Sequence, residues 1–184
     1  MSKQISAIDI KKLWYADSLS SSTDVALTPS GLKTILTTAT EIKNVHQDTW
    51  TIDESEASQE KYKNQLTGSV YRVGSKDMGE VTFSFTIGRY DYETKAALMG
   101  GTVITSTGDN AIGWSRARGV TDIKKMLIAL TEDDVYCVLP YGNVETREAN
   151  TDGAVGLAVV GTMLEPPSDN VDPEYWFDKE AVDA

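Results

Sequence analysis

Residues 79–103 read GEVTFSFTIGRYDYETKAALMGGTV, and this stretch decides the fold. From Val81 to Ile87, large apolar side chains alternate with Ser and Thr, so the apolar groups lie on one face of a strand and the hydroxyls on the other. Asp91 is a suitable N-cap for a short helix at Tyr92–Met99, and Gly100 can end that helix in a left-handed conformation. The stretch therefore predicts strand, helix and then a second strand.

The chain is acidic and of ordinary domain size. It has 184 residues and a formal net charge of −11, which fits one domain with a substantial core. Nucleic-acid-binding domains usually present a basic face, so this charge argues against tight phosphate binding, although acidity can also serve solubility alone. No apolar run reaches the ~18 residues of a membrane span or resembles a secretory signal, and we expect a cytoplasmic protein without a membrane anchor.

The residues that usually carry catalysis are scarce. Cys137 is the only cysteine and His46 the only histidine, which leaves too few ligands for a zinc site. The sequence contains no phosphate-binding glycine loop, no nucleophile elbow and no calcium loop. We therefore expect no catalytic, cofactor-binding or metal-binding residues, and a protein that is not an enzyme. A buried structural thiol is the expected state of Cys137.

The rest of the chain predicts mostly strands. Expected strands include Glu41–Ile52, Leu66–Val73, Thr102–Thr105, Ile123–Leu130, Val135–Leu139 closed by Pro140, and Val155–Leu164, with a polar excursion at Gly142–Gly153. The total is roughly eight or nine strands with one well-defined helix. This count predicts a mainly β protein, a β-sandwich or open β-barrel with one flanking helix at residues 92–99.

Two polar segments interrupt this pattern. Asp53–Gly79 begins with a highly charged, anchor-poor run, which we interpret as a long exposed loop or a frayed helical turn before the strand at Leu66–Val73. Residues 166–184 are rich in acids and contain Tyr175, Trp176 and Phe177 in a row. This tail is either a disordered end or an arm that docks on another surface. The expected organisation is one β domain at residues 1–165 and an acidic arm at 166–184.

Several runs resemble a known family. They are Glu60–Gly68, Gly79–Phe85, Tyr90-Asp91 with Leu98–Thr102, the acidic turn Thr131–Asp134 followed by Val138-Leu139-Pro140, and Gly156–Gly161. Together they are similar to the major tail tube proteins of long-tailed bacteriophages, which are themselves similar in fold to the tube proteins of type VI secretion. The resemblance covers roughly residues 40–165.

The resemblance implies a virion structural protein that is assembled in the bacterial host cytoplasm. Members form hexameric rings in which sheets of neighbouring subunits join around a channel, and the rings stack into a tube. The implied partners are other copies of the chain and other phage tail proteins, while DNA passes through without specific binding. A long loop reaches the neighbouring ring; its counterpart here is 53–79, with Tyr62, Leu66, Val70 and Tyr71 as interface candidates.

Two alternatives remain open. A β-sandwich could bind a sugar or a protein by using Trp14, Trp50, Trp114 or Trp176 as a platform, although core packing is the more common role of such residues. A hydrolase would depend on His46, for which the sequence offers no accompanying motif.

Overall fold

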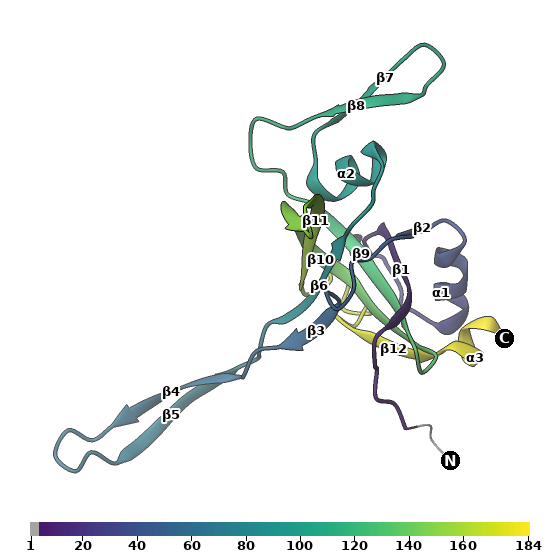
Figure 1. Ribbon diagram of the computed structural model, residues 1–184. Helices are drawn as coiled ribbons and strands as arrows, with labels where there is room; N and C mark the ends of the chain where they lie inside the picture. Colours follow the sequence, from purple (N-terminus) through teal and green to yellow (C-terminus); the bar gives the residue numbers. More distant parts are fainter. Residues whose placement is uncertain (1–3) are drawn as a thin grey trace.

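The computed structural model describes residues 4–184 and shows a mainly β protein with three short helices (Figure 1). The strands are β1 (Ile10–Asp17), β2 (Thr40–Glu41), β3 (Thr51–Glu54), β4 (Ser58–Lys63), β5 (Val70–Asp77), β6 (Val81–Ile87), β7 (Thr102–Thr105), β8 (Ala111–Ser115), β9 (Lys124–Thr131), β10 (Val135–Thr151), β11 (Ala154–Met163) and β12 (Tyr175–Asp178). The helices are α1 (Pro29–Leu36), α2 (Tyr92–Met99) and α3 (Lys179–Asp183). The mainly β class with a flanking helix is confirmed, with more strands and helices than expected.

One antiparallel sheet forms the body, in the order β2-β1-β9-β10-β11-β6-β3, and β12 pairs with β10. The sheet is curved, so that side chains from β1, β9, β11 and β6 pack in a single core. This sandwich-like arrangement lets Leu13, Leu127, Phe83 and Leu157 pack together with almost no exposure. Gly161 is needed there, since a Cβ at this position would lie 2.2 Å from Leu127 Cδ1.

The stretch that decides the fold behaves as its sequence predicts. In β6 the four apolar residues are buried and the three hydroxyl residues between them are half-buried. The Asp91 carboxylate accepts a hydrogen bond from the Thr94 N–H at 2.7 Å and caps α2; a hydrogen bond with the Thr94 side chain, and after it this backbone bond, lowers the pKa of Asp91. Gly100 follows α2 with φ +76°, a conformation that favours glycine. The predicted strand Thr102–Thr105 is β7.

Strand β10 corrects two expectations. It does not end at Pro140, and residues 142–151 are not an excursion but the second half of the same strand. Proline is tolerated because the register with β9 shifts between Leu139 and Gly142, so no ladder hydrogen bond from its nitrogen is required there. The first half of β10 therefore pairs with β9 and β12, and the second half pairs with β11, while Gly142 and Asn143 at its start also pair with β9.

The region before β6 also differs from the expectation. No continuous strand covers 41–52: β2 ends at Glu41, Val45 forms an isolated bridge to Ile87, and β3 begins only at Thr51. The predicted loop or frayed helix at 53–63 is wrong as well. Its second part is β4, which pairs with β5 to form a projecting two-stranded hairpin (Figure 1). Leu66 lies in the turn and not in a strand.

The C-terminal segment is part of the body. β12 pairs with the first half of β10, and Val182 of α3 is buried in a second core with Leu32 of α1. The Lys33 ammonium also donates to the carbonyl oxygens of Asp183 and Ala184 at 2.9 Å. Of the two interpretations of the acidic tail, docking is therefore correct, and the surface it docks on belongs to its own chain.

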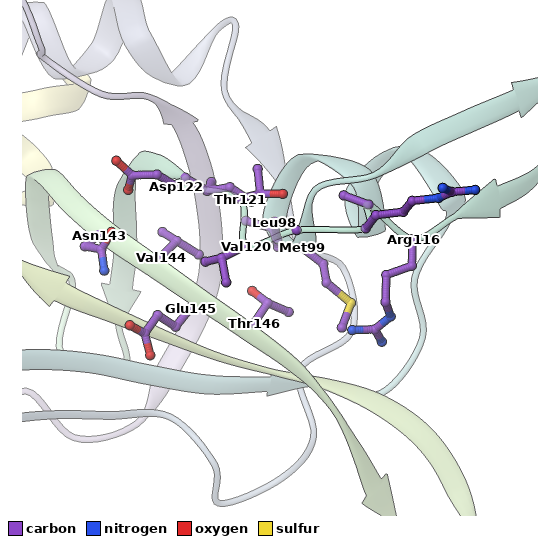
Figure 2. A pocket seen from close by; sticks show the side chains of 14 residues that line it. Leu98, Met99, Arg116, Val120, Thr121, Asp122, Asn143, Val144, Glu145 and Thr146 are labelled. Carbon is purple, nitrogen blue, oxygen red and sulfur yellow. The ribbon is translucent and has the colours of Figure 1, made fainter.

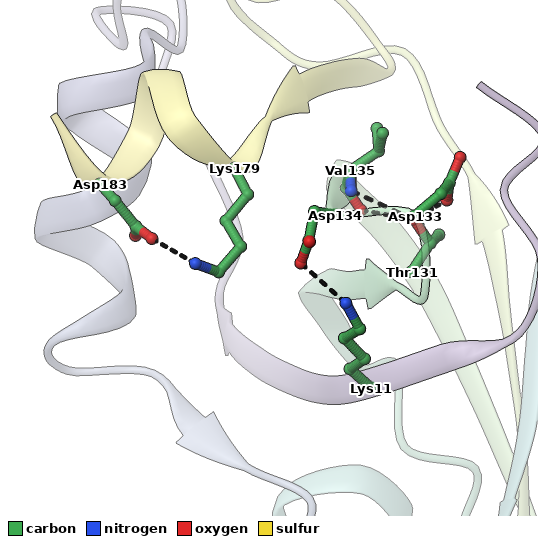
Figure 3. Close-up of polar contacts among 7 residues, drawn as sticks. All are labelled: Lys11, Thr131, Asp133, Asp134, Val135, Lys179 and Asp183. Carbon is green, nitrogen blue, oxygen red and sulfur yellow. Dashed lines mark hydrogen bonds and ion pairs between the residues drawn. The ribbon is translucent and has the colours of Figure 1, made fainter. Parts of the chain in front are cut away.

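The acidic turn at 131–134 connects three parts of the chain (Figure 3). The Asp133 carboxylate accepts hydrogen bonds from the Thr131 hydroxyl and from the N–H groups of Ser6 and Ala7. The Lys11 ammonium lies 2.9 Å from the Asp134 carboxylate, and Lys179 of α3 donates its N–H to the Asp134 carbonyl. The turn thus holds the N-terminal segment and α3 against the same end of the sheet.

Candidate subunit interface

Within the part of the chain that the structure describes, half of the main sheet has one uncovered face. β10 (second half), β11, β6 and β3 bury one face in the core, and the register places the following residues on the other: Thr82, Ser84, Thr86, Ala158, Val160, Thr162, Glu145, Arg147, Thr51 and Asp53. All are half-buried or exposed, and none belongs to either hydrophobic core. Small hydroxyl side chains dominate this face, and its charged residues are two acids and one arginine. We call it the bare face.

The half-sheet with the bare face has two open borders. In the part of the chain that the structure describes, β3 has no strand on its outer side, and the second half of β10 has none beyond Asn143 on the side away from β11. N–H groups alternate along a strand in an antiparallel ladder. The Ser55 N–H donates to the Glu80 carbonyl and therefore points toward β6. The N–H groups of Ile52 and Glu54 consequently point away from β6, to the open side. The Val144 N–H donates to the Ile123 carbonyl, on the side of β10 away from β11. The N–H groups of Thr146 and Glu148 therefore point to this same, open side of β10.

A groove runs beside the β10 border (Figure 2). It has a volume of about 800 Å³ and lies between this strand, the end of α2 and the loop at 116–123. Val144 and Thr146 line it from β10, and Val120 lines it from the loop with a fully exposed side chain. The buried Thr146 Oγ1 has no hydrogen-bond partner among the described residues. An unpaired hydroxyl beside an open strand edge is a feature that an added strand could satisfy.

An ion cluster adjoins this groove through Arg116, which lines the groove. The Lys95 ammonium lies 2.7 Å from Glu148 Oε1 and 4.2 Å from the centre of the Trp114 ring, and Arg116 lies 3.1 Å from Glu148 Oε2. The hydrogen bond from Lys95 is the main reason that the pKa of Glu148 is lowered. Trp114 Nε1 also donates to the Gly100 carbonyl at 2.8 Å. The cluster ties α2, β8 and β10 together, so the β10 border is held in a defined position.

No protein-family model and no curated protein sequence matches the chain. Within residues 4–184, no helix is long and apolar enough to cross a membrane. In the same residues, no group of three or more His, Cys, Asp or Glu side chains is placed to hold a metal ion.

The four interface candidates all lie on the hairpin β4–β5. Leu66, in the turn, is 94% exposed; Tyr71 and Val70 on β5 are 69% and 47% exposed. Tyr62 on β4 is half-buried beneath Arg72, whose guanidinium carbon is 5.1 Å from the ring centre. The structure therefore brings these residues together on one projection, and leaves three of them largely uncovered.

Three of the four tryptophans are packed within the fold. Trp14 is buried, Trp50 packs edge-on against Phe83 with ring centres 6.0 Å apart, and Trp114 belongs to the ion cluster. Trp176 is 36% exposed, and its indole N–H donates to Glu174. Core or cluster packing thus accounts for the first three.

The remaining candidates have ordinary surroundings. The His46 Nε2 atom lies 3.4 Å from the largely exposed Asp152 carboxylate in the turn between β10 and β11. Cys137 is a buried free thiol whose pKa is raised by burial, as expected for a structural residue.

Sequence reasoning found only a small part of the borders, since the strand predicted at Glu41–Ile52 includes only the first two residues of β3. Thr51–Glu54 and the second half of β10 are polar, so neither shows the apolar alternation that marks a half-buried strand. One signal could have predicted the second half of β10. Val144 and Thr146 are β-branched residues spaced two apart, and the strong strand at Val155–Leu164 that follows them requires a neighbouring strand.

Proposed function

We propose that this protein is a tail tube subunit of a long-tailed bacteriophage. Its copies assemble through their two open borders into rings, which we expect to be hexameric, and the rings stack around a DNA channel. The observation that carries the proposal is the pair of borders on one half-sheet, β3 on one side and β10 on the other. Different surfaces that pair head to tail generate a closed ring when the rotation closes.

Strand direction supports this pairing. The neighbours in the order β10-β11-β6-β3 are all antiparallel, so β3 runs opposite to β10. When β3 of one copy is placed beside β10 of the next, this pair of strands is therefore antiparallel as well. Strand direction then alternates around the whole ring. The outward N–H groups of Ile52 and Glu54 would then lie beside the backbone groups of β10 that have no hydrogen-bond partner in the monomer.

The bare face suits the wall of a channel. In a closed ring of such half-sheets, one face is turned toward the core of each subunit, and the bare face lines the opening. Its Thr and Ser hydroxyls and its single arginine offer few cationic contacts that would retain phosphate during DNA passage. The net charge of −11 acts in the same direction over the whole molecule.

The alternative of a sugar- or protein-binding module has less support, since three of the four tryptophans are occupied within the fold. A hydrolase has less still, because His46 lies against an exposed carboxylate of a surface turn. Both alternatives would also leave the two borders without a role.

The test is to block one border. In Glu54→Pro the outward N–H is replaced by a proline ring, while the neighbouring residues keep their N–H groups toward β6; Glu54→Ala is the matched control that removes only the side chain. Negative-stain microscopy and sedimentation over a range of concentrations should show rings or tubes for the wild-type protein and for Glu54→Ala, and monomers for Glu54→Pro. Monomers in all three at high concentration would overturn the proposal, as would rings of Glu54→Pro.

A further inference from the structure

The two open borders carry opposite charges on the bare face. On β3 this face presents Asp53, and on β10 it presents Glu145 and Arg147. Asp53 and Arg147 are both exposed, and within residues 4–184 neither side chain has an ion pair or a hydrogen bond. One border therefore offers a carboxylate, and the other offers a guanidinium that no group of its own copy neutralises.

The backbone limits how the two borders can pair. The outward N–H groups belong to Ile52 and Glu54 on β3 and to Thr146 and Glu148 on β10. In an antiparallel ladder, residues with such groups face each other and exchange hydrogen bonds, and the residues between them form close pairs without hydrogen bonds. A slip of one residue would turn the bare face of one copy against the core face of the next. The allowed registers therefore differ by steps of two residues.

Three such registers place all four residues of β3 beside the open part of β10. In the first, Asp53 faces Glu145, so two carboxylates are opposed, and a ladder bond is lost because the Val144 N–H already donates within its own copy. In the second, Asp53 faces Arg147 and the ladder is complete. In the third, Asp53 faces Ala149, which leaves both exposed charges without a partner. The charges thus favour the second register.

We propose that Asp53 of one copy forms an ion pair with Arg147 of the next, and that this pair selects both the partner strand and its register. This inference rests on the proposed ring assembly and adds the residues that make the joint specific. In the same register Glu54 faces Thr146, so its carboxylate accepts a hydrogen bond from the Thr146 hydroxyl, which has no partner among the described residues. The ion pair also neutralises the arginine of the bare face, which would otherwise bind DNA phosphates.

A charge swap tests the pair. Asp53→Arg and Arg147→Asp should each raise the protein concentration at which rings form by about tenfold or more, because like charges then face each other at every joint. The double variant Asp53→Arg/Arg147→Asp should form rings at the wild-type concentration. Asp53→Arg/Arg89→Asp is the matched control, since it has the same net charge but changes an exposed arginine between β6 and α2, and it should not restore rings.

Disulfide cross-linking measures the register. In the proposed register Thr51 and Ala149 form the neighbouring close pair, with Cα atoms ~4.5 Å apart, a separation that a disulfide spans. Mild oxidation of assembled Thr51→Cys/Ala149→Cys should give a ladder of covalent oligomers in non-reducing electrophoresis. Thr51→Cys/Thr151→Cys, which would be linked in the third register, should stay monomeric. The native Cys137 is buried and does not take part.

The outcomes separate this pair from the proposed function. Rings of either single charge variant at the wild-type concentration, failure of the charge-swapped double variant to form rings, or a ladder from Thr51→Cys/Thr151→Cys would overturn the ion pair and its register while wild-type rings still support the proposed function. Absence of wild-type rings would instead overturn the proposed function. The inference requires loss of rings in both single variants, recovery in the charge-swapped double variant alone, and a ladder from Thr51→Cys/Ala149→Cys.

Discussion

The two halves of the main sheet differ in what covers their outer faces. Over β1, β9 and the first half of β10, this face carries Met126, Ile128, Tyr136 and Val138, which are buried beneath α1 and α3. Over the second half of β10, β11, β6 and β3, the same side of the sheet is bare. The covered half is completed within one chain, including its C-terminal segment.

This difference follows the sequence of each half. The covered face presents large apolar side chains, whose exposure would cost about 25 cal/mol for each Å² left in water. The bare face presents Thr82, Ser84 and Thr86, which water solvates well, so the monomer gains little by covering it. One curved sheet thus provides a folded body and a surface with open borders, and the proposed assembly uses only the latter.

The largest expected effect is on DNA retention by the bare face. In Thr82→Lys/Thr86→Lys, each ring would gain a band of cations inside the channel, and assembled tubes should retain double-stranded DNA in a form protected from nuclease. The affinity of these tubes for DNA should fall about a thousandfold between 50 and 200 mM salt, because lysines that bind phosphates displace counterions from the DNA. Wild-type tubes should retain none under the same conditions.

The control places the same charges elsewhere. Thr37→Lys/Thr38→Lys adds two lysines to exposed positions after α1, on the covered half. DNA associated with that variant should stay open to nuclease. Equal protection by both variants would mean that the bare face does not line a closed channel.

The second effect concerns monomer stability. Met126 is fully buried on the covered face, so Met126→Ala should lower the free energy of unfolding by about 2–5 kcal/mol. Val160, 36% exposed on the bare face, should change it by only about 0.5 kcal/mol when replaced by alanine. Urea denaturation of dissociated protein measures both. Similar losses would show that something in the monomer already covers the bare face.

Local patterns were enough to predict the covered and core-facing elements. The strands at 81–87 and near 123–130 were predicted closely because each shows its burial in its own sequence, and the helix at 92–99 was predicted because Asp91 and Gly100 mark its two ends. The hairpin β4–β5 stands in solvent, so β4 lacks a buried face and its sequence predicts a loop or a frayed helical turn, and the strand predicted at Leu66–Val73 overlaps only the first half of β5. The sequence predicts that the strand ends at Pro140, because no local signal shows that this proline falls where the register with β9 shifts.

The candidate interface was only partly predictable. Tyr62, Leu66, Val70 and Tyr71 came from a resemblance, and the structure places them on one projection. The borders depend on which strands are neighbours across more than sixty residues of sequence, as in the pairing of Val159 with Phe85, and single-sequence patterns contain no register of that kind.

A smaller effect is expected at the cap of α2, which adjoins the β10 border. Asp91→Ala removes the acceptor for the Thr94 N–H and should lower the free energy of unfolding by about 1 kcal/mol. Asp91→Asn keeps an acceptor and should recover most of that loss. Thermal denaturation of the three proteins measures the difference, and an alanine variant as stable as the wild type would contradict the capping role.

The smallest effect should appear in the covered half, at the turn that holds the N-terminal segment. Hydrogen bonds, first from the Thr131 hydroxyl and then from the Ser6 N–H, lower the pKa of Asp133 from its usual 3.8 to about 2. A carboxyl with a lowered folded-state pKa stabilises the fold above its unfolded value and loses that contribution as pH falls through the folded value. Asp133→Asn should therefore melt slightly below the wild type at pH 7, and the gap should shrink between about pH 4 and pH 2. A gap in melting temperature that stays constant over this range would mean that the ionised carboxylate does not hold residues 6 and 7 to the turn. The covered half would then be held together by fewer contacts within its own chain than the structure indicates.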